Sequence, residues 1–207
     1  MDQAALITSF ITLFVIIDPI GLAPLFVALT KGETGAHRRG IALRATLIAF
    51  GLLVLFGLFG EAVLGFAGIS MPAFRIAGGI LLFLTALDML FERRTKRRKG
   101  QANSANDPSV FPLATPLIAG PGSIATIILL TGQANGEWAA IGAVMLVLLA
   151  VLLLVLMFFL SAGLLERALG DTGTNVVTRL LGMLLAALSV QFVIDGITAV
   201  NWLAGQG

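Results

Sequence analysis

One aspartate stands inside an otherwise apolar segment, and it is the strongest candidate for chemistry in this chain. Asp18 lies in the stretch IDPIGLAP, residues 17–24, beside two prolines and a glycine. An acid within a membrane span is costly and usually faces the bundle interior or a cavity. Asp18 could therefore bind a substrate ammonium, a sodium ion or a proton. The alternative is that Asp18 merely caps a helix that begins at Pro19.

A second stretch of small and turn-forming residues is LATPLIAGPGSIAT, residues 113–126. Glycines allow close approach to the backbone, and the N–H groups after Pro121 could form an anion-binding nest. The candidate residues of this stretch are Thr115, Pro116, Gly120, Pro121, Gly122, Ser123 and Thr126.

Further polar residues lie near the ends of apolar segments. Arg75 and Arg179 each have a glycine three residues later. Such a pair could gate the two mouths of a pathway or bind an acid such as Asp195, although an arginine at a helix end often only reaches towards the membrane surface. Gln191 is an interior polar candidate that helix–helix hydrogen bonding would also explain.

The composition argues against metal or redox chemistry on the chain itself. There is no cysteine, which excludes disulfides and thiolate sites, and one histidine with scattered carboxylates does not support a metal site. No hydrolase or kinase motif is present. We therefore expect a protein that is not an enzyme and has no cofactor, with H⁺ or Na⁺ as the candidate coupling ion.

Hydropathy predicts the fold class. The chain is 58% apolar and 12% charged, with a mean hydropathy of +1.02, which is typical of a polytopic helical membrane protein. We predict an all-α fold in which Pro/Gly motifs break spans one and four. The six spans are expected at about residues 4–29, 42–66, 71–91, 110–131, 138–165 and 176–203.

The basic residues predict how the spans are oriented. With the N-terminus outside, nearly all of them fall in inner loops, and only Arg75 lies near the outer side. The positive-inside rule therefore favours both termini outside, and the charge signal concerns topology rather than nucleic acid. Residues 92–109 form a basic cytoplasmic linker, either a hinge between halves or a segment that recognises anionic lipid.

An internal repeat is visible. Aligning the two Pro/Gly stretches superposes Pro19 on Pro121 at an offset of 102 residues, and a second match superposes Arg75 on Arg179 at an offset of 104. These matches predict two three-helix units, residues 1–91 and 110–207. An odd number of spans inverts the second unit, so a pseudo-two-fold axis in the membrane plane is expected, as in alternating-access transporters.

Four stretches, IDPIGLAPLF, PLATPLIAGPGSIAT, RIAGGILLF and RLLGMLLAA, resemble the MarC family of bacterial inner-membrane proteins with six spans. Some members are described as transporters of small neutral amino acids, and the family is grouped with amino-acid exporters of the lysine-exporter superfamily. The resemblance implies a substrate site lined by the matching motif residues. They are Asp18, Pro19, Gly21, Pro24, Gly120, Pro121, Gly122 and Ser123.

Together these features favour a secondary transporter of glycine or alanine, with export among the options. Asp18 would take the ammonium or a coupling cation, and the backbone of residues 120–123 the carboxylate. The expected partners are the lipid bilayer and the amino acid, without nucleic acid, and a homo-oligomer stays open. One alternative is a scaffold that docks partners on the basic linker. An ion channel is another, but it would need more polar lining. A drug efflux protein is the third, but Phe26 is the only aromatic residue in the two Pro/Gly stretches, residues 17–30 and 113–126.

Overall fold

A computed structural model describes residues 3–91, 107–134 and 136–204. All the regular structure in this part of the chain is helical, which confirms the predicted all-α class. The elements in chain order are α1 (Gln3–Ile17), α2 (Pro19–Leu29), α3 (Gly35–Phe66), α4 (Met71–Leu90), the π-helix η2 (Ser109–Ile118), α6 (Pro121–Gly132), α7 (Trp138–Leu160) and α8 (Ala162–Ala204).

The structure has six candidate spans when the bent fourth span is counted as one, which is the predicted number. Five segments of the described chain are long and apolar enough to cross a membrane, and η2 and α6 form a sixth that is bent by 55°. The second span begins earlier than expected, because α3 starts at Gly35. The sixth lies within α8, where the crossing segment is Thr172–Val200 and Gly170 interrupts the helix with φ 59°.

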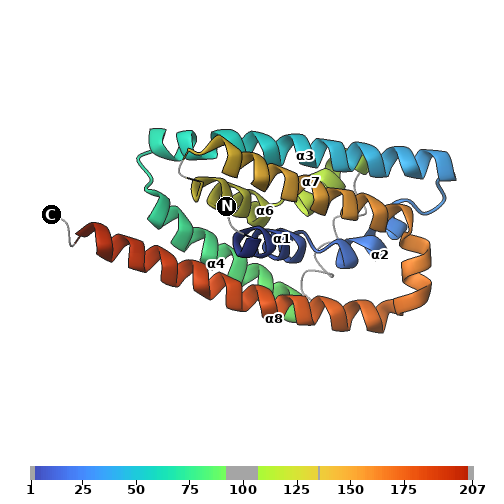
Figure 1. Cartoon of the computed structure of the whole chain (residues 1–207). Coiled ribbons are helices and arrows are strands. Elements are labelled where there is room, and N and C mark those ends of the chain that lie inside the picture. The colour runs from blue at the N-terminus through green and yellow to red at the C-terminus, as the bar shows by residue number, and fades with distance from the viewer. Residues whose placement is uncertain (1–2, 92–106, 135, 205–207) are drawn as a thin grey trace.

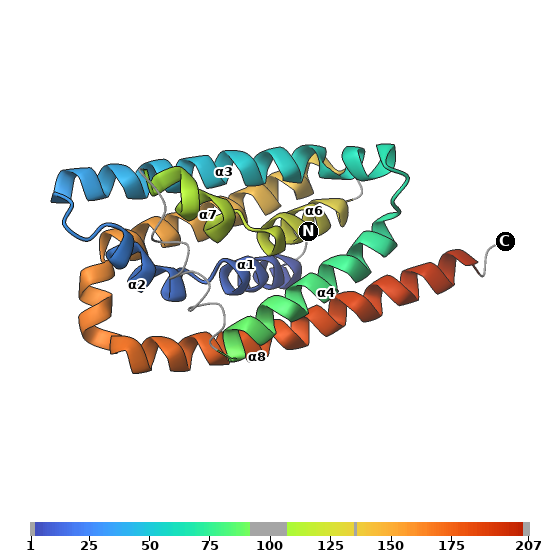
Figure 2. The same cartoon turned by 180° about the vertical axis from the view of Figure 1, so that it is seen from behind.

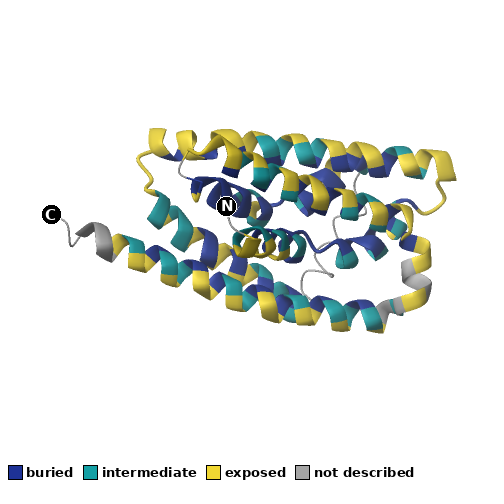
Figure 3. Ribbon diagram, viewed as in Figure 1, coloured by how far each residue is buried: buried dark blue, intermediate teal, exposed yellow. Residues whose placement is uncertain are grey.

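The broken first span forms the centre of the bundle. Figures 1 and 2 show α1 and α2 in the middle, with α3 along one side and α4 and α8 along the other. Both half-helices pack against α7 and α8, and α1 also packs against α6. Figure 3 shows that the central helices are more buried than the outer ones. Within an apolar stretch of 18 residues, 61% of the residues are buried in Gln3–Leu29, against 28% in α3. The apolar side chains exposed on the outer helices therefore face lipid.

Glycines allow the surrounding helices to approach closely. A Cβ at Gly57 of α3 would lie 3.1 Å from Ile127 of α6, and one at Gly79 of α4 would lie 2.8 Å from the carbonyl oxygen of Ser189 in α8. Small residues at helix contacts are the usual means of close packing in membranes, where lipid removes most of the hydrophobic drive for association. These contacts fix the outer helices around the central broken span.

Each half of the chain consists of a broken span followed by two further spans. The predicted inversion of residues 110–207 relative to residues 1–91 stays a prediction, as do the domain bounds. Most of the predicted linker, residues 92–106, lies outside the described residues.

Candidate functional site

The first break is a single residue. Asp18 has none of its surface exposed, and it is the one non-glycine residue with positive φ in the described chain, at φ 59° and ψ 64°. Aspartate tolerates this left-handed conformation better than most residues. Its Oδ1 accepts a hydrogen bond of 3.0 Å from the N–H of Gly21. Asp18 therefore caps α2, as the structural alternative proposed, and is at the same time a carboxyl group buried within a span.

The residues after Asp18 suit this cap. Pro19 occupies the first turn of α2, where a missing N–H costs nothing. A Cβ at Gly21 would overlap the carboxylate of Asp18, so a glycine leaves room for the cap. Pro24 does not end the helix, because α2 continues through it to Leu29. The chain thus turns at Asp18 alone.

The second break is longer and differently built. In η2, the bonds Phe111–Pro112 and Thr115–Pro116 are cis, and Phe111 and Thr115 have non-helical backbone angles. Gly120 then begins α6 from an extended conformation, and a Cβ there would overlap the carbonyl oxygen of Pro116. Figure 2 shows η2 lying along α3, on the side of the bundle opposite α8.

The structure brings the two breaks together at Gly122. A Cβ on this glycine would lie 2.8 Å from Cδ1 of Ile16, two residues before Asp18. Close by on α6, Ser123 and Thr126 are buried, and the hydroxyl of Thr126 has no hydrogen-bond partner within the described chain. Pro121, by contrast, is exposed. The two breaks thus approach each other where Gly122 meets Ile16, and Pro121 faces away from the interior.

A polar pocket of about 200 Å³ lies between α1, α6 and α8. Two of the residues picked from the sequence are in its wall: Gln191 Nε2 donates to Asp195 Oδ1 at 2.7 Å. The rest of the wall consists of Ala5, Thr8, Ser9, Thr12, Leu130, Gln133, Leu188 and Phe192. We call this the outer pocket, after the predicted orientation of the chain.

Hydroxyl groups lead from the outer pocket towards the breaks. On α6, Leu130 lines the pocket and Gly122 contacts α1. Thr126 is four residues from each, so it lies on the same face of the helix. On α1, Thr12 lies in the pocket wall six residues before Asp18, which corresponds to about 9 Å along a helix. Thr12 and Thr126 thus lie on the side of the pocket nearer the breaks, and the hydroxyl of Thr12 donates to the carbonyl of Thr8 at 2.7 Å.

A second pocket, of about 310 Å³, lies at the other end of the broken span, and we call it the inner pocket. Phe26 of α2 stacks on Phe159 of α7 with ring centroids 4.4 Å apart, and the guanidinium of Arg38 lies 5.2 Å from the Phe26 centroid. Arg39 and Ser161 also line this pocket. Phe26 follows Asp18 by eight residues, so the buried carboxyl group lies between the two pockets along the span.

The predicted gating residues are placed differently from one another. Arg75 is half-buried in the second turn of α4, and its Nε has no hydrogen-bond partner within the described chain, whereas Arg179 is exposed on α8. Asp195 accepts from Gln191, and no ion pair joins it to Arg75. A gating role for the two arginines stays a prediction.

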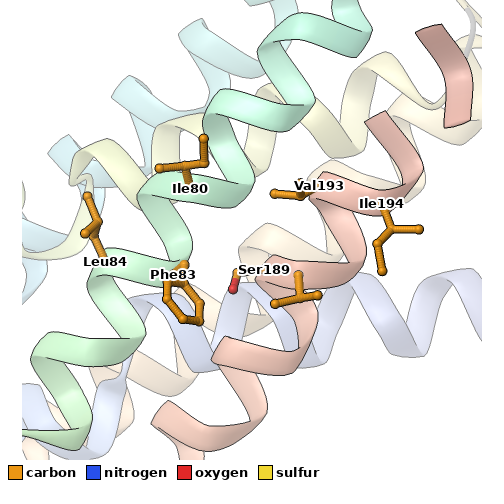
Figure 4. A pocket seen from close by; sticks show the side chains of 7 residues that line it. Ile80, Phe83, Leu84, Ser189, Val193 and Ile194 are labelled. Atoms are coloured by element: carbon orange, nitrogen blue, oxygen red, sulfur yellow. The ribbon is translucent and has the colours of Figure 1, made fainter. Parts of the chain in front are cut away.

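The groove between α4 and α8 does not have the chemistry of an amino-acid site. Figure 4 shows its wall of apolar side chains around Phe83 and Val193, in a volume of about 260 Å³. Its one hydroxyl, on Ser189, donates to the carbonyl of Ala186 in the same helix at 2.7 Å. Within the described residues there is also no group of three side chains that could hold a metal ion.

Outside the spans, one acid ties the start of η2 to α3. Asp107 Oδ1 accepts from the hydroxyl and the N–H of Ser109, at 2.7 and 3.0 Å, and Oδ2 lies 3.5 Å from Arg44. The hydrogen bonds from Ser109, with a smaller contribution from Arg44, lower the pKa of Asp107. The charged form is therefore favoured by the fold.

This lowered pKa predicts a pH dependence of stability. A carboxyl group whose pKa is depressed on folding stabilises the protein above its unfolded pKa of about 3.9, and that contribution is lost as the pH falls through the folded value. At pH 7 the unfolding temperature of wild type should be higher than that of Asp107→Asn. The difference should be about 4 °C or less, because the Asp107–Arg44 pair is half exposed. Thermal unfolding from pH 3 to 7 checks this, and a difference that grows towards low pH would contradict it.

Sequence reasoning missed two parts of the site. The hydroxyls of Thr8, Ser9 and Thr12 recur at helical spacing in an apolar segment, and this spacing was a usable signal. The stacked pair Phe26 and Phe159 had no such signal, because it joins helices far apart in the chain.

Comparisons with known proteins agree over almost the whole chain. The sequence profile of a family described as MarC family integral membrane proteins matches residues 3–201. A membrane protein of Methanocaldococcus jannaschii is 38% identical over 95% of this chain and 98% of its own length. The membrane protein YvbG of Bacillus subtilis is 36% identical over 91% of this chain and 92% of its own length. The inner membrane protein YhgN of Escherichia coli is 33% identical over 97% of this chain and 98% of its own length. No solved structure matches.

Proposed function

The chain belongs to the MarC family of integral membrane proteins, and from this premise we propose that it is a secondary transporter of small neutral amino acids such as glycine and alanine. The relative YhgN is named an inner membrane protein, and we place this chain in the bacterial inner membrane as well. The distribution of basic residues supports an orientation with both termini outside.

The observation that carries the proposal is the position of Asp18. Its carboxyl group is fully buried at a helix break, with a polar pocket towards one end of the same broken span and a basic pocket towards the other. A buried acid between two openings suits alternating access, in which a site within the membrane is reached from one side at a time. The described conformation corresponds to the occluded stage of that cycle.

The two ends of a zwitterion have different partners in this proposal. Asp18 receives the ammonium group or a coupling cation, and the hydroxyls of Ser123 and Thr126 with the backbone at Gly122 receive the carboxylate. The unpartnered hydroxyl of Thr126 supports this, because a buried polar group without a partner is costly until a ligand satisfies it. Asp18 fills the space beside Gly21, and Ile16 fills the space beside Gly122, so little volume is left there for a substrate side chain. This favours glycine and alanine over larger amino acids.

Counterflow in liposomes tests the proposal. Purified protein is reconstituted with internal unlabelled alanine, and entry of labelled alanine or glycine is followed with and without a sodium or pH gradient. We expect saturable entry of both, and weak entry of leucine or phenylalanine. If folded wild-type protein moves neither small amino acid, the transporter proposal is overturned and the scaffold alternative is favoured.

A further inference from the structure

The inner pocket contains arginines that no described side chain neutralises. Arg38 Nη2 is buried and has no hydrogen-bond partner in the described part of the chain. Arg38 and Arg39 both line the pocket, and no acidic residue among the described side chains does. A buried, unsatisfied charged donor costs more than a neutral one, so the pocket is completed best by an anion.

The neighbouring ionic and aromatic contacts do not supply that anion. Two acids of the described chain have other partners. Oε2 of Glu33 lies 3.8 Å from Nε2 of His37, and Oδ2 of Asp107 lies 3.5 Å from Nη1 of Arg44. The Cζ of Arg38 lies 5.2 Å from the centroid of the Phe26 ring, which carries no net charge, and the five N–H donors of a guanidinium lie in its plane. The plane of donors is thus left for an acceptor such as a phosphate, which arginine binds through two parallel hydrogen bonds.

The rim of the pocket indicates where this phosphate comes from. Leu160 and Leu164 line the pocket with 56% and 73% of their surfaces exposed. In a membrane protein such side chains face acyl chains, so a ligand that joins a phosphate to hydrocarbon satisfies both parts of the pocket. Lys31 lies at the same end of the bundle, in the turn between α2 and α3, and basic pockets between helices on the cytoplasmic side of a membrane favour anionic head groups.

We propose that the inner pocket binds the phosphate of an anionic phospholipid from the surrounding leaflet, with Arg38 and Arg39 on the phosphate and the acyl chains along Leu160 and Leu164. Inorganic phosphate shares the phosphate chemistry but lacks the chains. The proposal concerns binding alone, so it stands or falls separately from the transport of amino acids.

Lipid binding to the purified full chain in detergent tests this. Delipidated protein is titrated with short-chain phosphatidylglycerol, with short-chain phosphatidylcholine or with inorganic phosphate, and both thermal unfolding and the number of bound lipids in native mass spectra are recorded. We expect phosphatidylglycerol to raise the unfolding temperature most and to be retained as a bound lipid. The double variant Arg38→Gln/Arg39→Gln should bind it about tenfold more weakly, the cost of losing one or more charged hydrogen bonds.

Lys31→Gln is the matched control, because it removes one positive charge from the same end of the molecule outside the pocket. It should bind phosphatidylglycerol as wild type does. The single variants Arg38→Gln and Arg39→Gln keep more of the pocket. If both bind phosphatidylglycerol as tightly as wild type does, the proposal is wrong. An equal effect of inorganic phosphate would overturn the lipid assignment, and an equal effect of Lys31→Gln would show that only the surface charge matters.

Discussion

Replacing Asp18 with asparagine is expected to slow amino-acid counterflow strongly while the protein stays folded. Asparagine keeps the side-chain oxygen that accepts from the N–H of Gly21 at 3.0 Å, it is an equally good helix cap, and it tolerates a left-handed backbone. It removes the charge and replaces the second carboxylate oxygen with an NH₂ group. Losing a charge that holds a substrate ammonium or a coupling ion should lower the transport rate by about tenfold to a hundredfold.

Asparagine and alanine at position 18 separate the two roles of this residue. Asp18→Ala removes the cap as well as the charge, so it should lower the unfolding temperature, whereas Asp18→Asn should leave it near that of wild type. Counterflow and thermal unfolding are measured on the same preparations. Wild-type transport by Asp18→Asn would mean that Asp18 is a cap and nothing more.

Replacing Gly120 with alanine is expected to cost both stability and transport. The added methyl would collide with the carbonyl oxygen of Pro116, which belongs to the backbone and cannot rotate away as a side chain does. The start of α6 would have to move, and with it Gly122 and Ser123. We expect a loss of about 2–3 kcal/mol, at the upper end for overpacking, and a loss of transport of at least about tenfold.

Gly142→Ala on α7 is the control for this substitution, because a Cβ there meets nothing within 4 Å. It should leave unfolding and counterflow unchanged or stabilise slightly, since alanine favours a helix over glycine. Both variants are compared by unfolding in detergent and by counterflow at matched reconstitution. If Gly120→Ala transports as well as Gly142→Ala, the start of α6 is not part of the substrate site.

The spans and the first break could be predicted because their signals are local. An apolar run of membrane length identifies a span whatever surrounds it, and Asp18 beside Pro19 is a strong cap signal within a few residues. The same logic located Gly120 at the second break. The backbone of η2 could not be predicted, because its non-helical angles at Phe111 and Thr115 depend on packing against α3.

The pockets could be predicted only in part, for the same physical reason. Gln191 and Asp195 are one helical turn apart, so their hydrogen bond is a local event that the sequence suggests. The stacking of Phe26 on Phe159 joins α2 to α7, and nothing in either segment identifies its partner. Arg38 was counted as a loop charge for topology, and its place over the Phe26 ring follows from that distant pairing.

The central position of the first span has a consequence for how the protein is made. The ribosome produces α1 and α2 before the other helices, yet the helices that cover them most are α6, α7 and α8, from the second half of the chain. Contacts so distant in sequence form late and slowly. Until they form, Asp18 must cross the lipid without its protein surroundings, where an acid is poorly tolerated. Biogenesis is therefore the stage at which this span depends most on neutralising Asp18 or on help from the insertion machinery.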